Sequence, residues 1–339
     1  MIEIGNLESA LTGRIPKGEA FRPSEIGLDE CAGTSQKDDV SDSSETTVRE
    51  EWQKEARPLT PKYPTESTVV AIDSTGFILG YMSDGLVGTL RASVVTKPAG
   101  ESRHKLELYG PYLIAVTNAN KESIYQNLYR TVYGEPIISP VPDLANIIDR
   151  MRNIFERHIE LEVAKRSRNS LILLDGSLIG GTVANPGSFL KNIINNAAGN
   201  RNSIAAISKS TGLVLQRSRR SILSLLDGVA GPCYAGSIKN HLEQNPERYF
   251  GDIYVARLTP CGEPFRIDLP DNAPEPHIEL LNALSGLAGD YGYPEELKLA
   301  HMTCVLSGIE VLELQAAAIA LHGLVTKEEA DIRPRLFPL

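Results

Sequence analysis

Residues 171–177 read LILLDGS, an apolar run of four residues that ends in an acid followed by two small residues. Residues 69–76 read VVAIDSTG, in which apolar, mostly β-branched residues again lead to an acid and then to Ser, Thr and Gly. Short apolar runs bounded by turn residues are typical of buried strands. Acids at the ends of neighbouring strands can converge at one edge of a sheet, so the pattern predicts that Asp73 and Asp175 share a site.

The segments around these two strands predict an α/β fold. Residues 77–82 and 86–96 are extended segments separated by hairpin turn chemistry at Ser83, Asp84 and Gly85. After Asp143, a plausible N-cap, apolar residues recur at three- and four-residue spacing, which predicts a long amphipathic helix up to residue 168. Other expected elements are strands at 112–117, 204–207, 253–258 and 265–269 and helices at 185–198, 217–226 and 294–323.

The composition is that of a globular protein: 339 residues, 42% hydrophobic and 23% charged. The net charge is −9, so any nucleic-acid contact must come from a local basic surface. Four cysteines lie far apart without a C-x-x-C pair, which argues against a zinc knuckle and fits a reducing compartment. The longest apolar stretch, near residues 303–324, is interrupted by Glu310, Glu313 and Gln315. We therefore expect a cytoplasmic protein that does not enter a membrane.

The first 62 residues differ in composition from the rest. Residues 29–55 are dominated by Ser, Thr, Gly and acids and have almost no large apolar side chain. This pattern predicts an acidic, partly flexible N-terminal arm over residues 1–62, followed by one domain over residues 63–339. A solvated linker explains the arm more simply than a specific binding tail does.

Paired acids of this kind can bind hard divalent cations. Two such ions about 3.5–4 Å apart can activate water and stabilise the leaving oxygen in phosphodiester cleavage. One such aspartate could simply begin a turn, but two similar junctions that flank one long helix favour a site. The helix offers Glu156, Glu160 and Glu162 as a third ligand. Its apolar arc favours Glu162, because Glu160 points nearly opposite.

A basic segment follows the second junction. Residues 176–226 contain no acid and six cations, namely Lys191, Arg201, Lys209, Arg217, Arg219 and Arg220. In an acidic protein, this local excess of positive charge predicts a phosphate-binding channel beside the metal site. For residues 216–221 alone, a solvated helix face explains the charges equally well.

The order strand, strand, strand, helix, strand, with acids on the first strand, the helix and the fourth strand, resembles the ribonuclease H-like fold. More narrowly, the sequence resembles the NurA nuclease family. The resemblance rests on VAIDSTG at 70–76, ELEVA at 160–164, LILLDGSL at 171–178, ISKS at 207–210, YVARL at 254–258, FRID at 265–268, and GYP at 292–294 leading to AH at 300–301. It implies an α/β fold with a mixed sheet flanked by helices. The acidic N-terminal arm, which has no counterpart in the family pattern, and the long C-terminal helix are expected from composition and periodicity instead.

The resemblance also implies an activity. Members of this family are manganese-dependent deoxyribonucleases of the single-strand endonuclease and 5′–3′ exonuclease type. They act with the hexameric translocase HerA in double-strand-break end resection, and they are dimers with a central DNA channel. We therefore expect a DNA substrate, a HerA-type partner, a homodimer, and one or two ions of Mn²⁺ or Mg²⁺.

Residue by residue, the resemblance implies that Asp73, Glu160, Asp175 and His301 hold the metal and that Lys209 contacts a phosphate. Arg217, Arg219 and Arg220 are the further nucleic-acid contacts that the basic segment predicts. The family pattern and the helix periodicity disagree, so Glu160 is taken as the ligand and Glu162 as its rival. Tyr254 is a candidate for the tyrosine that the family has near its site.

Two other classes of function remain open. An inactive adaptor of a DNA translocase would keep the fold and lose the site, but the acids are retained. An ATPase of the actin or sugar-kinase type would use a Gly-rich phosphate loop and a duplicated half, and the sequence shows neither. Apolar residues on more than one side of the closing helix favour a second subunit and hence a C₂ dimer.

Overall fold

The computed structural model describes residues 10–11, 18–24, 46–49, 56–137 and 140–326. The acids of the N-terminal arm between Asp38 and Glu51 lie outside the described residues. The described parts of the arm add strands to the domain: β1 (Ala20–Pro23) pairs with β4, β2 (Thr46–Val48) pairs with β9, and β3 (Arg57–Pro58) pairs with β10.

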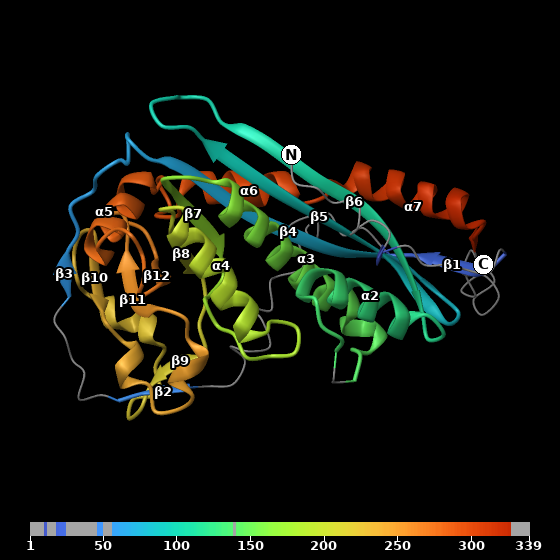
Figure 1. Cartoon of the computed structure of the whole chain (residues 1–339), viewed down its shortest axis with the longest axis horizontal. Coiled ribbons are helices and arrows are strands. Elements are labelled where there is room, and N and C mark those ends of the chain that lie inside the picture. Colours follow the sequence, from blue (N-terminus) through green and yellow to red (C-terminus); the bar gives the residue numbers. More distant parts are fainter. Residues whose placement is uncertain (1–9, 12–17, 25–45, 50–55, 138–139, 327–339) are drawn as a thin grey trace, which may run out of the picture.

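A mixed sheet organises the described part of the chain (Figure 1). Its long ribbon is formed by β4 (Thr68–Met82), β5 (Gly85–Lys97) and β6 (Lys105–Thr117), which are antiparallel. On the other side of β4 follow β7 (Ser170–Asp175) and β8 (Ser203–Ser208), both parallel to it. The sheet continues through β12 (Pro264–Leu269), β11 (Asp252–Arg257) and β10 (Cys233–Gly236). The short strands β9 (Leu213–Leu215) and β13 (Val325–Thr326) pair with β2 and β1.

Helices cover both faces of this sheet. One face carries α2 (Lys121–Tyr133), α3 (Leu144–Arg166) and α4 (Gly187–Gly199), and the other carries α5 (His277–Leu287) and α6 (Glu295–Cys304) (Figure 1). Val70 and Ile72 of β4 point into the core under α3, whereas Val69 and Ala71 point into the core under α6. This two-residue alternation is the strand period, and it decides which face each later side chain of β4 reaches.

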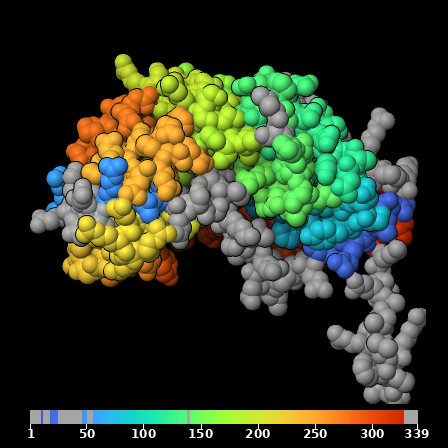
Figure 2. Space-filling model, turned by 90° about the horizontal axis from the view of Figure 1, so that it is seen from below, coloured from blue at the N-terminus to red at the C-terminus, as the bar shows by residue number. Residues whose placement is uncertain are grey.

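In Figure 2 the yellow and orange segments that follow α4 lie at one end of the visible face, α2 and α3 lie in the other half in green, and the teal strands lie beyond them. The remaining helical pieces are the 3₁₀ turns η1 (Ile222–Leu226), η2 (Lys239–His241) and η3 (Pro246–Arg248). Most expected elements are confirmed within a few residues, including the hairpin turn, β7, α3 with its Asp143 cap, and α4.

The first apolar run does not end at Asp73, as its turn-like residues predicted. β4 continues to Met82, because β5 pairs with it from Val69↔Lys97 to Met82↔Gly85 and so supplies ladder hydrogen bonds along its whole length. Gly76 serves packing rather than a turn: a Cβ there would lie 3.2 Å from a side-chain carbon of Ile148 on α3. Asp73 therefore lies inside a strand rather than at its end.

Two expected helices also differ. Residues 216–220 form a turn, and only the 3₁₀ segment η1 follows it, capped by Ser221. The closing segment is helical from Glu295 but divides at Val305 into α6 and α7 (Gly308–His322), because Ser307 and Glu310 form a new capping box.

The segment Glu295–His322 contains an 18-residue window with the apolar composition of a membrane span, with a mean hydropathy of 1.7. The same test is passed by core helices of soluble proteins. Here α6 buries Leu297, Ala300 and Cys304 against the sheet, and α7 buries Val311 and Ala318. Only 28% of the apolar window is buried inside the described structure, so these contacts account for part of its apolar composition.

Candidate metal centre

The sheet brings Asp73 and Asp175 together. Ile72 pairs with Leu174 across the parallel β4–β7 ladder, so Asp73 and Asp175 follow side by side. Each stands two residues beyond a core residue that faces α6, namely Ala71 and Leu173, so both carboxylates point to that face. Asp73 is fully buried, and the Asp175 side chain is 1% exposed.

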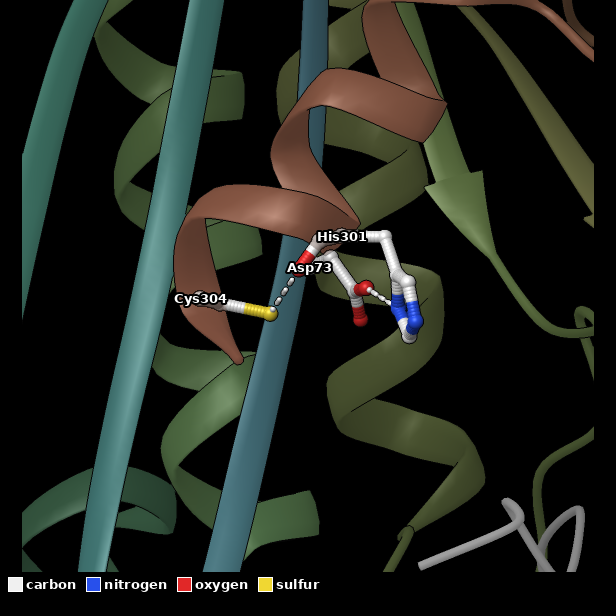
Figure 3. Close-up of side chains that lie close together, drawn as sticks. All are labelled: Asp73, His301 and Cys304. Carbon is white, nitrogen blue, oxygen red and sulfur yellow. Dashed lines mark hydrogen bonds and ion pairs between the residues drawn. The ribbon is translucent and has the colours of Figure 1, made fainter. Parts of the chain in front are cut away.

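Lys209 and His301 complete this group. Lys209 stands two residues beyond Ile207, which is the strand partner of Asp175, and its Nζ lies 2.7 Å from Asp175 Oδ2. His301 follows the buried Ala300 on α6, and its Nδ1 lies 2.7 Å from Asp73 Oδ2 (Figure 3). The backbone N–H of Ser74 donates to Asp73 Oδ1 at 2.7 Å.

The electrostatics of this group favour a bound cation. Burial raises the pKa of Asp175, and the charge of Asp73 raises it further, against the opposing effect of Lys209. The hydrogen bond to Asp73 raises the pKa of His301. Two neighbouring buried carboxylates repel each other when both are ionised, and a divalent ion between them would remove this cost.

Cys304 lies beside these residues. Among the described residues, possible ligand atoms of Asp73, His301 and Cys304 lie within 4.8 Å of one another. However, burial strongly raises the pKa of the Cys304 thiol, and its Sγ instead donates to the carbonyl oxygen of His301 at 3.2 Å (Figure 3). A neutral thiol is a poor ligand, so the carboxylates and the imidazole fit a hard ion such as Mn²⁺ or Mg²⁺ better than a thiolate-bound metal.

A second group of acids lies on α3. Ser74 Oγ donates to Glu156 Oε2 at 3.0 Å, and Arg152 donates to the same oxygen at 3.1 Å. Burial raises the pKa of Glu156 to about 8, and the charges of Glu160 and Asp73 add to this effect. Glu160 is 2% exposed and accepts a hydrogen bond of 2.6 Å from Arg157. Because the charge of Asp73 acts on both Asp175 and Glu156, Asp73 links the two groups electrostatically.

The buried acids of α3 are thus Glu156 and Glu160, and the helix-periodicity argument for Glu162 was wrong about burial. Glu162 is half-buried and pairs with the exposed Lys165 at 2.8 Å. The periodicity argument assumed one apolar face, whereas α3 lies between the sheet, α2 and α4 and is buried around most of its circumference. The i,i+4 spacing of Glu156 and Glu160 is the sequence signal that places both on one helix face.

A cavity of about 680 Å³ opens next to this centre. Lys209 and His301 form part of its wall, together with Phe265, Tyr291 and Tyr293. The tyrosine near the centre is therefore Tyr293, whose ring lies 4.9 Å from Lys209 Nζ. Tyr254 points elsewhere: its hydroxyl contacts His277 at 3.0 Å and Asp252 at 3.2 Å.

Arg217, Arg219 and Arg220 stand in the exposed turn before η1 rather than on a helix. Arg220 forms an ion pair with Asp227, which lines the cavity. The turn therefore approaches the rim of the cavity, although the three side chains do not join the carboxylate group described above.

Comparison with known proteins gives a family model and a set of structures. The model of the NurA domain matches residues 67–306. No curated protein matches the chain. The NurA nuclease from Sulfolobus solfataricus has a similar structure, with a TM-score of 0.52 at 16% identity over 80% of this chain and 89% of that chain. This likeness shows the fold, a mixed α/β architecture of the ribonuclease H-like kind.

Two endonucleases V give weaker structural matches. The enzyme from Streptomyces avermitilis has a TM-score of 0.35 at 12% identity, over 80% of this chain and 100% of that chain. The enzyme from Ciona intestinalis, in complex with DNA that contains an inosine, has a TM-score of 0.34 at 12% identity, over 76% of this chain and 92% of that chain. Neither match is close enough to bear on the site.

Proposed function

This chain belongs to the NurA domain family, and from that premise we propose that it is a metal-dependent deoxyribonuclease whose centre is built on Asp73 and Asp175. The observation that carries the proposal is the pairing of these two buried carboxylates with His301 and Lys209 at hydrogen-bond distance. The raised pKa of Asp175 supports it, because Lys209 offsets only part of the cost of burying this acid and a bound cation would offset more.

In this proposal Asp73, Asp175, Glu160 and His301 hold one or two ions of Mn²⁺ or Mg²⁺. Such ions, when bound, would activate water and neutralise charge on the phosphate. His301 engages Asp73 through Nδ1, so Nε2 is the nitrogen that can coordinate an ion or hold a proton. Carboxylates and an imidazole suit Mn²⁺ in particular, since Mg²⁺ prefers oxygen ligands alone.

Lys209 binds the substrate. Its Nζ is held 2.7 Å from Asp175, and its side chain remains 44% exposed, so it can present a positive charge to a phosphate oxygen next to the acids. The turn with Arg217, Arg219 and Arg220 would contact phosphates further along the strand. These cations attract DNA locally to a chain whose net charge is −9.

The family resemblance supports finer expectations. The substrate is single-stranded DNA and DNA ends, the activity is endonucleolytic and 5′–3′ exonucleolytic, and the partner is a HerA-type hexameric translocase in end resection in the cytoplasm. A homodimer is supported by exposed apolar side chains on α7, where Ile309 is 72%, Leu312 57% and Leu321 72% exposed.

A nuclease assay tests the proposal directly. End-labelled single-stranded and duplex DNA is incubated with the purified chain in Mn²⁺, in Mg²⁺ and in EDTA, beside the Asp175→Asn variant. We expect cleavage of the single strand in Mn²⁺, none in EDTA and none with the variant. Lack of cleavage by the wild type under every condition, with and without a HerA-type partner, would favour the inactive adaptor.

A further inference from the structure

We propose that the cavity beside the metal centre is a nucleobase pocket, which holds one unstacked base of the nucleotide whose phosphate lies at Lys209. The inference rests on the proposed nuclease function, because it identifies the part of the substrate that the cavity receives. At about 680 Å³ the cavity has the size of a small-molecule site.

The position of the cavity links it to the centre. Lys209 and His301 form part of its wall, and the same two side chains contact Asp175 and Asp73 at 2.7 Å. The centre and the cavity therefore share a boundary. The sugar and base of a nucleotide whose phosphate contacts Lys209 would therefore lie next to the cavity.

The chemistry of the wall suits a base. Phe265 and Tyr293 lie with ring centroids 5.4 Å apart, and Tyr291 adds a third ring that is 81% exposed. Aromatic rings at such a site stack on bases of any sequence, since every base has a π face. Because Tyr291 is so exposed at the mouth of the cavity, its ring is accessible for such stacking.

Cations stand beside the rings. Lys209 Nζ lies 4.9 Å from the Tyr293 ring, and Lys298 Nζ lies 5.8 Å from the Tyr291 ring. The rings can stack on bases and the lysines can bind phosphates, so their alternation along the wall fits a nucleic-acid strand, in which bases and phosphates also alternate. The acids Asp227 and Glu263 also line the cavity, and Asp227 is already paired with Arg220.

The walls are fixed by the fold. A Cβ on Gly292 would lie 2.9 Å from the Cα of Gly262, so the loop between α5 and α6 packs backbone against backbone on the loop between β11 and β12. Within the first loop, Gly292 N donates to the carbonyl of Gly289 at 2.8 Å, which holds Tyr291 at the tip of a tight turn. On the opposite wall, Arg257 donates to the carbonyl of Leu226 at 2.9 Å and so anchors η1.

A base can enter such a pocket only after it leaves its stack. Unstacking is least costly in a single strand or at a frayed end. The pocket would therefore favour those substrates over internal duplex positions and would not require a particular base.

Binding measurements without cleavage test the pocket. Fluorescence anisotropy in Ca²⁺ compares a labelled oligothymidylate with an abasic strand of equal length, which carries the same phosphates. We expect the wild type to bind the thymidylate roughly tenfold more tightly. Tyr291→Ala should lose most of this difference and Tyr291→Phe should keep it. Tyr81→Ala removes an exposed tyrosine eight residues along β4 from Asp73 and should behave as wild type.

The outcomes separate this inference from the proposed function. Equal affinity of the wild type for both strands, binding of neither strand, or an unchanged difference in Tyr291→Ala would overturn the pocket. Failure of the chain to cut DNA in Mn²⁺, together with a base-dependent affinity that Tyr291→Ala removes, would overturn the nuclease and leave a base-binding site. Cleavage without base-dependent affinity would overturn the pocket alone.

Discussion

Replacing Glu156 by Gln should stabilise the metal-free chain. The pKa of Glu156 is raised from an ordinary value of 4.5 to about 8, because the carboxyl is buried near Glu160 and Asp73. A raised carboxyl pKa contributes stability that is fully present below pH 4.5 and is lost as the pH rises through about 8. Within that window the free energy of unfolding falls by about 1.4 kcal/mol per pH unit, so at pH 7 the ionisation of Glu156 lowers it by about 3 kcal/mol.

Gln keeps the acceptor oxygen for Ser74 and cannot ionise. The free energy of unfolding in EDTA should therefore rise by up to about 3 kcal/mol at pH 7 and change little at pH 4.5. Added Mn²⁺ should stabilise the wild type more than the variant, because the ion favours the ionised carboxyl. Denaturant unfolding at pH 4.5, 7 and 8.5 measures these differences.

Glu162→Gln is the matched control. Glu162 pairs with the half-exposed Lys165, and such solvent-exposed ion pairs contribute little, so the free energy of unfolding should change by no more than about 0.5 kcal/mol. If Glu156→Gln unfolded more easily than the wild type at pH 7, or showed the same pH dependence, the electrostatic description of α3 would be wrong.

Four further predictions follow from the site and the surface. Asp73→Asn and Asp175→Asn should each abolish Mn²⁺-dependent cleavage while unfolding free energy in EDTA hardly falls, since each removes one charge from a repelling pair; near wild-type cleavage would refute the metal site. Glu160→Gln should lose activity and Glu162→Gln should keep it, and equal mild effects would show that α3 supplies no ligand. Changing Arg217, Arg219 and Arg220 together to Gln should reduce the slope of log K against log salt concentration for single-strand binding by about 2, since each phosphate contact contributes about 0.7. Arg103→Gln, at another exposed arginine, is the control. An unchanged slope would show that the three arginines do not contact DNA. Light scattering should give twice 36.9 kDa, and Leu312→Glu should lower this mass toward one chain; a wild-type monomer would contradict the dimer.

The local elements were predictable from the sequence. The strand that ends at Asp175 and the capped helix α3 depend on apolar runs and caps within a few residues. Asp73 and Asp175 could be expected to share a site because two similar runs lead to them. That Asp73 lies inside β4 depends instead on thirteen residues of β5, whose pairing overrides the turn preference of Ser, Thr and Gly.

Other parts of the site depend on contacts between distant segments. Helix periodicity distinguishes one buried face from one exposed face, so it wrongly favoured Glu162 over the buried Glu160 on a helix that is buried around most of its circumference. Periodicity also could not tell which apolar residues of α7 stay exposed: Leu314 packs, partly buried, on the core beneath α7, whereas Leu312 is exposed. The cavity wall includes residues of η1, β12, α6 and the loop before α6, and no local pattern indicates that these segments meet.

Because Asp73 lies inside β4, the fold holds its carboxylate in place before the proposed metal ion binds. Asp73 pairs with Ser93 on β5, and the preceding Ile72 pairs with Leu174 on β7, so backbone ladders on both sides hold this proposed ligand in place without an ion. Small zinc domains fold only around their metal, because nothing else fixes their ligands. Here the ion would bind to side chains that the fold already holds in place. Chelation should therefore abolish cleavage and leave the protein folded.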